Sequence, residues 1–112
     1  MLSIRWTALE GWQAPKIHPI DDLKLHPATS SLHYAFQCFE GTKAYKDKSG
    51  RLRLFRPHMN MQRLKRSAAR LALPIFDESQ AVDVLARFVA CEERFVPRYV
   101  IAESRDVACF GH

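Results

Sequence analysis

Three arginines at positions 63, 66 and 70 carry the first chemistry that the sequence suggests. Their spacing of three and then four residues places them on one stripe of a helix. Guanidinium groups match phosphate oxygens in a bidentate fashion, so this stripe could hold a phosphate group. A solvated helix face would carry the same pattern, and periodicity does not say which arginine would be special. The stripe therefore predicts either a phosphate site or a hydrated surface.

A second candidate is the stretch YAFQCFEGTK at residues 34–43. Tyr34 and Phe39 could wall an apolar pocket, with Lys43 as a nearby positive charge. Gly41 would let the backbone approach another group closely or turn sharply. The alternative is that Phe36 and Phe39 belong to the core, Gly41 to a turn and Lys43 to the solvated surface. The residues alone leave both interpretations open.

Other kinds of reactive site find little support. The five histidines lack the H-x-H or H-x-x-x-H spacing of metal ligands, so we expect no metal site. The three cysteines include no C-x-x-C, which argues against a zinc knuckle and a disulfide framework and favours a reducing compartment. No G-x-S-x-G nucleophile motif is present, and no pair of carboxylates is assigned an acid–base role.

The charge balance points to an anionic partner. The 17 lysines and arginines exceed the 12 acidic residues, which gives a net charge of +5. Since the basic residues are spread out and are densest at residues 43–70, a phosphorylated small molecule is favoured over nucleic acid. No apolar run approaches the ~18 residues of a membrane span, and residues 1–12 resemble neither a signal peptide nor a transit peptide. We therefore expect an intracellular protein that binds neither nucleic acid nor membrane.

The periodicity predicts an α+β domain, a small antiparallel sheet with two flanking helices. We expect a strand at residues 2–7, an extended connector at 10–31 that three prolines keep from forming a long helix, and a β-hairpin at 41–55 with Gly50 in its turn. Helices are predicted from Pro57 to about Leu73, where Pro74 forbids continuation, and from about Glu78 to Glu93 after an Asp77 cap. The predicted core residues of the two helices are Met61, Leu64, Ala68, Leu71, Ala72, Val82, Leu85, Ala86 and Val89.

Two dense stretches of the chain resemble a known family. The segment LHPATSSLHYAFQCFEGTKAY, residues 25–45, and the segment RLRLFRPHMNMQRLKRSAARLALPIFD, residues 51–77, follow each other in the family's order. Together with GWQAPKIHPIDDLKLHPA before them, they resemble the N-terminal small domain of the branched-chain amino acid aminotransferases. These are enzymes of fold type IV that use pyridoxal 5′-phosphate, and the eukaryotic members are the most similar. The resemblance covers residues 1–97.

The resemblance implies a role for four residues. Arg63, in NMQR, corresponds to the arginine that binds the cofactor phosphate. Tyr34 and Phe39 correspond to walls of the pocket for the branched aliphatic side chain, and Lys43 to a basic position beside it. The implied reaction is reversible amino transfer between leucine, isoleucine or valine and 2-oxoglutarate, with a lysine that forms a Schiff base with the cofactor.

The chain departs from the family pattern after residue 97. The family's Schiff-base lysine lies in a larger C-terminal domain, and none of the six lysines here matches its context, so no catalytic residue is assigned. Residues 98–112 diverge from the family and are expected to be disordered or artefactual. We expect a fragment that is inactive alone, from an enzyme that is a homodimer at full length and is cytoplasmic or mitochondrial, without a presequence in this chain. The alternative is a non-catalytic regulatory module that pairs with a full-length subunit.

Overall fold

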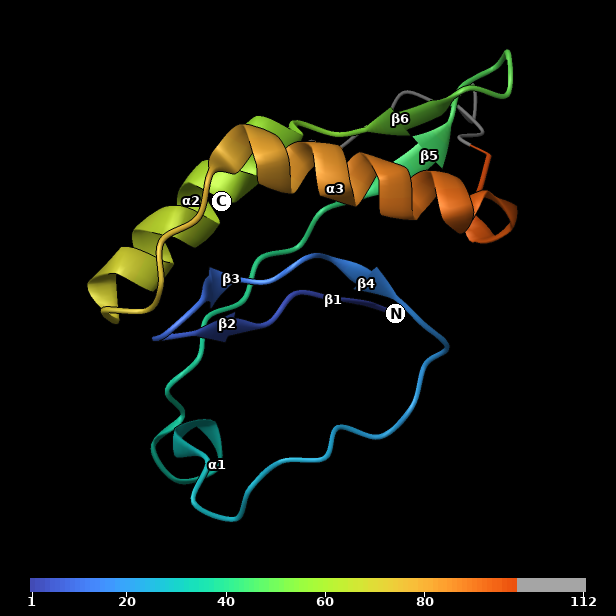
Figure 1. Cartoon of the computed structure of the whole chain (residues 1–112). Helices are drawn as coiled ribbons and strands as arrows, with labels where there is room; N and C mark the ends of the chain where they lie inside the picture. The colour runs from blue at the N-terminus through green and yellow to red at the C-terminus, as the bar shows by residue number, and fades with distance from the viewer. Residues whose placement is uncertain (99–112) are drawn as a thin grey trace.

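The computed structural model describes residues 1–98 of the chain (Figure 1). Its most extensive contact between elements joins two helices. Helix α2 spans Pro57–Arg70 and helix α3 spans Glu78–Cys91, and the two lie side by side. Both predicted helices are thus confirmed, and Pro57 occupies the first turn of α2, where a missing N–H costs nothing. Asp77 caps α3, since its carboxylate accepts a hydrogen bond of 2.8 Å from the Gln80 amide.

The core between these helices is small. Of the apolar side chains in residues 1–98, those of Met61, Ala68 and Val82 are buried. Leu64 and Leu71 are half-buried, as are Leu85 and Val89 on α3. An ion pair between Lys65 Nζ and Glu78 Oε1 at 3.1 Å joins the two helices at the edge of this core. The predicted core is therefore confirmed in outline, although Ala86 is exposed.

Helix α2 ends three residues earlier than predicted. Ala72 adopts a left-handed conformation with φ of 51°, and its amide donates to the Ala69 carbonyl at 3.1 Å. The Leu73 amide donates to the Ala68 carbonyl at 2.9 Å, which completes a Schellman cap with an alanine in the usual glycine position. The prediction that Ala72 belongs to the buried stripe was wrong, because the chain leaves the helix before this residue and exposes it.

The predicted hairpin is present as strands β5, Ala44–Lys46, and β6, Leu52–Leu54. Ala44 pairs with Leu54 and Lys46 with Leu52 in antiparallel register. Gly50 has φ of +81°, as its predicted place in the turn requires. The Asp47 carboxylate accepts from Ser49, Arg51 and Arg53 across the turn. Residues 97 and 98 return to the edge of β5, where the Lys46 amide donates to the Pro97 carbonyl at 2.9 Å.

The N-terminal region differs from the prediction. The expected strand at residues 2–7 is divided into β1, Leu2–Ser3, and β2, Trp6–Thr7. The first part of the expected connector folds back on it as β3, Gly11–Trp12, and β4, Lys16–Ile17. Gly11, with φ of +70°, directly follows the three turn residues 8–10 and begins β3, and the sequence prediction did not include this turn. The register changes by one residue between the two ladders, so residues 13–15 form a bulge opposite residues 4 and 5.

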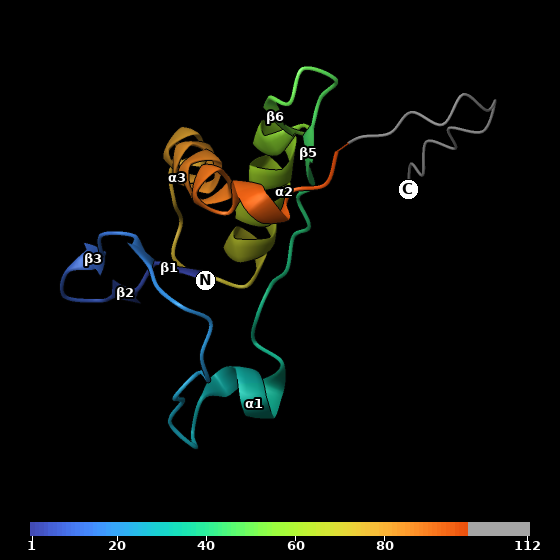
Figure 2. The same cartoon turned by 90° about the vertical axis from the view of Figure 1, so that its right-hand side faces the viewer.

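The rest of the connector leaves the helices. Residues 18–29 run without regular structure to a short helix, α1, Ser30–Tyr34. Figure 2 shows α1 standing apart from α2 and α3, reached and left by extended chain. The N-terminal hairpin is anchored differently, since the Trp12 indole N–H donates to the Ile75 carbonyl between the two long helices at 2.8 Å. Within residues 1–98, no hydrogen bond joins residues 19–36 to α2 or α3, whereas His18 is still bonded to the Met1 carbonyl.

These elements confirm the predicted α+β class and its incomplete character. The sheets are small, antiparallel and two-stranded, rather than one sheet with two helices against it. Sixteen large apolar side chains in residues 1–98 are exposed, including Leu9, Phe39 and Phe95. In the described part of the chain, none of the helices is long and apolar enough to cross a membrane. The predicted tail at residues 98–112 lies, except for its first residue, outside the described residues.

Candidate functional site

The site is built where residues 37–42 run beside helix α2. Asn60, in the first turns of α2, is buried, and its side-chain amide donates to the Gly41 carbonyl and to Thr42 Oγ1. A buried amide without partners would be costly, so these bonds fix the segment against the helix. The sequence interpretation assigned no role to Asn60, and its partners lie 19 and 18 residues away.

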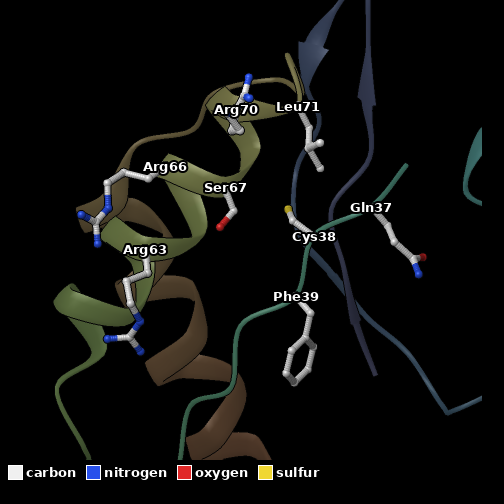
Figure 3. Close-up of a pocket in the computed structure, with 8 residues that line it drawn as sticks. All are labelled: Gln37, Cys38, Phe39, Arg63, Arg66, Ser67, Arg70 and Leu71. Carbon is white, nitrogen blue, oxygen red and sulfur yellow. The ribbon is translucent and has the colours of Figure 1, made fainter. Parts of the chain in front are cut away.

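An open pocket of about 590 Å³ lies between this segment and α2 (Figure 3). One wall comes from α2 and the residues after it, and the other from the extended segment. The lining residues are Gln37, Cys38, Phe39, Arg63, Arg66, Ser67, Arg70 and Leu71. Figure 3 shows Ser67 on α2 facing Cys38 of the extended segment across the gap, while the side chains of Arg66 and Arg70 extend away from it. The pocket thus combines apolar walls with positive charge.

Arg63 has a carboxylate partner. Its Nε donates to Glu40 Oε2 and its Nη2 to Glu40 Oε1, each at 2.9 Å. Arg66 and Arg70 have no such partner within residues 1–98. Within residues 1–98, Arg63 is thus the one arginine of the stripe that a carboxylate orients, and which of the three binds a phosphate group stays a prediction.

This pairing changes the titration of both groups. The hydrogen bonds from Arg63 hold the pKa of the Glu40 carboxyl below its ordinary value, although partial burial acts in the opposite direction. The same contact raises the pKa of Arg63. Both side chains are therefore charged in the folded protein at neutral pH. Glu40 was not among the residues that the sequence singled out, because nothing local indicates a partner 23 residues away.

The four predicted site residues are placed unequally. Arg63 and Phe39 line the same pocket, and Phe39 is 89% exposed, so its ring forms an open wall. Tyr34 ends helix α1, is 83% exposed and does not line this pocket. Lys43 is exposed just before β5 and also lies outside the lining. The structure brings two of the four together, and the roles of all four stay predictions.

Gly41 is not explained by a turn. Its φ is not in the left-handed region, and an added Cβ would meet Phe39 Cζ at 3.8 Å, an ordinary van der Waals distance. Nothing in residues 1–98 therefore requires glycine there. Among the same residues, no three histidine, cysteine, aspartate or glutamate side chains come together as metal ligands.

The fold and this site define a small α+β domain that presents an open, arginine-bearing pocket. Comparison with curated proteins places it more narrowly. Over 97 residues the chain is 46% identical to the cytosolic branched-chain-amino-acid aminotransferase of Caenorhabditis elegans and 47% identical to the mitochondrial enzyme of Bos taurus. It is 42% identical to the branched-chain-amino-acid aminotransferase of Dictyostelium discoideum over the same length. The predicted resemblance to the branched-chain amino acid aminotransferases is thus confirmed.

The match covers most of this chain but a minor part of each relative. The match covers 87% of this chain but 23% of the Caenorhabditis elegans enzyme and 25% of the Bos taurus enzyme. The chain therefore spans about a quarter of the length of the curated relatives that it matches. No protein-family model matches the chain. The relatives include both cytosolic and mitochondrial proteins.

Proposed function

We propose that this chain supplies one wall of the cofactor and substrate site of a branched-chain amino acid aminotransferase. The observation that carries the proposal is the 42–47% identity to such enzymes over 97 residues. The meeting of Arg63 and Phe39 at one pocket supports it independently, because these residues come from segments 24 positions apart. Neither the comparisons nor residues 1–98 favour a non-catalytic regulatory module.

The pocket suits the phosphate end of pyridoxal 5′-phosphate. Arg63 is 48% exposed, and its Nη1 amino group has no partner within residues 1–98, so N–H donors stay available for phosphate oxygens. The Ser67 hydroxyl lies on the same wall and is a further donor. A volume of about 590 Å³ falls within the range of small-molecule sites. When bound, the cofactor supplies the electron sink for amino transfer.

The substrate side of the proposed site is apolar. Phe39 and Tyr34 would contact the branched aliphatic side chain of leucine, isoleucine or valine, at about 0.8 kcal/mol for each methylene group removed from water. Lys43 would add a positive charge beside this contact. Because both aromatic rings are largely exposed here, another polypeptide surface must complete their enclosure.

The amine that reacts with the cofactor must come from elsewhere, since no lysine lines the pocket in the described chain. We propose that residues 1–97 form the small domain of a longer enzyme whose larger domain carries this lysine. The substrates would be branched-chain amino acids and 2-oxo acids, and the complete enzyme would be a homodimer. Its compartment would be the cytosol or the mitochondrion, the two that the names of the relatives give.

The first prediction concerns the phosphate ligand. The probe is 4′-deoxypyridoxine 5′-phosphate, which has no aldehyde and so cannot react with surface lysines, and binding is followed by ³¹P NMR. We expect Arg63→Gln to weaken binding by about tenfold or more, as the loss of charge-assisted hydrogen bonds requires. Arg70→Gln is the matched control, since it removes the same charge from the same helix without a fixed carboxylate partner. Equal losses in the two variants would contradict the assignment of Arg63.

The activity is tested by reconstitution. The chain is mixed with the portion of the Bos taurus relative that it does not match, and transfer from leucine to 2-oxoglutarate is measured. The proposed function predicts activity that depends on Arg63 and on both polypeptides. Binding of the probe without any activity would limit the proposal to the phosphate site.

A further inference from the structure

Glu40 is held more firmly than an ordinary surface carboxylate. Its side chain is 13% exposed, although Arg63 opposite is 48% exposed. Besides the two bonds from Arg63, Glu40 Oε1 accepts the Gly41 amide at 3.0 Å. Three donors therefore converge on one carboxylate, which fixes its position as well as its charge.

The backbone that carries Glu40 is tied to the same helix as Arg63. Asn60 lies one helical turn before Arg63 and binds the Gly41 carbonyl and Thr42 Oγ1. Movement of Glu40 relative to Arg63 is thus restricted at both ends, by the ion pair and by the Asn60 contacts. This arrangement resembles a carboxylate that orients a functional side chain more than a chance surface pair.

The edge of the guanidinium that Glu40 occupies decides what remains for a ligand. Glu40 takes the Nε and Nη2 edge, and Nη1 has no partner within residues 1–98. A guanidinium group has five N–H donors in a rigid fork, so this pairing leaves the outer edge of the fork for another anion. Arg66 and Arg70, which extend away from the pocket in Figure 3, are not oriented in this way.

We propose that Glu40 is the positioning residue of the anion site, which holds Arg63 so that the outer edge of its guanidinium receives a phosphate group. This inference rests on the proposed function, which assigns the phosphate to Arg63. A free arginine side chain would have to be ordered when the ligand binds, and that cost weakens affinity. In the paired state the ordering has already occurred.

A Glu40 that competes with the phosphate group would have the opposite effect on binding from a Glu40 that positions Arg63. If Glu40 only competed with the phosphate for Arg63, or only opposed it by charge, removing its charge would strengthen phosphate binding. If Glu40 positions Arg63, Glu40→Gln weakens binding by about threefold to tenfold, the cost of ordering one long side chain. The sign of the change therefore separates the two roles.

The experiment uses the full chain and 4′-deoxypyridoxine 5′-phosphate, with affinities from ³¹P NMR and the Arg63 Nε–H followed by ¹⁵N NMR. In the wild-type chain we expect a slowly exchanging Nε–H signal that shifts when the probe is added. Glu40→Gln should lose the slow exchange and bind the probe more weakly, and Glu40→Asp, which keeps the charge on a shorter side chain, should recover part of both. Glu93→Gln is the matched control, because it removes one carboxylate that pairs with Lys46 instead.

Each outcome bears on a definite statement. Two results would overturn the positioning role of Glu40: stronger binding of the probe by Glu40→Gln, or an Arg63 Nε–H in the wild-type chain that exchanges as fast as that of free arginine. In both cases Arg63→Gln still tests whether Arg63 binds the phosphate group. If Arg63→Gln binds as the wild type does, the proposed function fails first and this inference with it. If Glu40→Gln does not fold, the probe affinity of Glu40→Asp and the exchange of the Arg63 Nε–H in the wild-type chain still test the positioning role.

Discussion

The proposed phosphate role of Arg63 carries an entropic cost, which the contact of Arg63 with Glu40 would reduce. Arginine has a long side chain, and ordering it on binding reduces the affinity gained from its hydrogen bonds. The bidentate contact with Glu40 orders this side chain in advance. A surface ion pair of this kind adds little to folding stability in general, so its main consequence is expected for binding.

The pair also predicts a dependence of stability on pH. Arg63 holds the pKa of Glu40 below its ordinary value of 4.5, so the folded chain binds this proton less readily than the unfolded chain. The stability that the pair contributes is therefore complete above the unfolded pKa and is lost as the pH falls through the folded one. We expect the difference in unfolding free energy between wild type and Glu40→Gln to shrink from about pH 6 to about pH 3, measured by urea denaturation.

The other titrating groups do not obscure this comparison. Asp47, whose pKa is lowered chiefly by the Ser49 hydroxyl, contributes to acid unfolding in both proteins and cancels in the difference. Arg63→Gln should lose the same acid-dependent part as Glu40→Gln, because it leaves the carboxylate without its partner. A difference that stays constant across this range would show that Glu40 does not titrate against Arg63.

At the residue level the sequence could place Arg63 on a helix but could not find Glu40. The arginine stripe has a local period, whereas the Glu40 contact depends on how two segments 23 residues apart come together. The same holds for Asn60, whose partners are a backbone carbonyl and a threonine of the other segment. A side chain whose role depends on a long-range partner leaves no periodic signal in a single sequence.

Among the elements, those with local signals were predicted well. Pro57 and Asp77 marked the beginnings of α2 and α3, and Gly50 marked the turn of the β5–β6 hairpin. The N-terminal hairpin was not predicted, because the three prolines in residues 10–31 indicate an extended connector, whereas Gly11 directly follows the turn of this hairpin. Helix α2 also ends before the predicted position, because the chain already turns at Ala72, two residues before Pro74.

The cap at Ala72 gives a prediction about α2. An L-residue with a side chain is disfavoured in the left-handed region, and glycine is not, so Ala72→Gly should stabilise the folded chain by about 0.5–1 kcal/mol. Ala69→Gly is the matched control, because Ala69 is an exposed residue within the same helix and glycine should destabilise it by about 0.5–1 kcal/mol. Urea denaturation measures both, and destabilisation by Ala72→Gly would contradict the Schellman cap.

At the scale of the whole molecule, the exposed apolar side chains outnumber the buried ones among residues 1–98. The radius of gyration is 16.8 Å, whereas a compact domain of this length would have about 13 Å. Exposed apolar side chains follow the segment at residues 18–36, including Ile20, Leu23, Leu32 and Tyr34. Large exposed apolar surfaces commonly mark contacts with another polypeptide, which agrees with a chain that spans about a quarter of its relatives. Composition could not predict this imbalance, because 47% hydrophobic residues are equally compatible with a closed core.

We expect a protease to cleave this chain first in the irregular segment at residues 18–29. Lys24 is exposed in the irregular stretch 18–29, whereas Lys65 lies within α2 and pairs with Glu78. Since proteases cut where the backbone opens at little cost, limited trypsin treatment should cleave after Lys24 at least about tenfold faster than after Lys65. Mass spectrometry of the early products measures the two cleavage rates, and Lys24→Gln should slow the early cleavage without changing the later one.

Adding the complementary portion of the Bos taurus relative should protect Lys24 if that polypeptide covers residues 18–36. Equal early cleavage at Lys65 would mean that the α2–α3 pair is not the stable part of the chain.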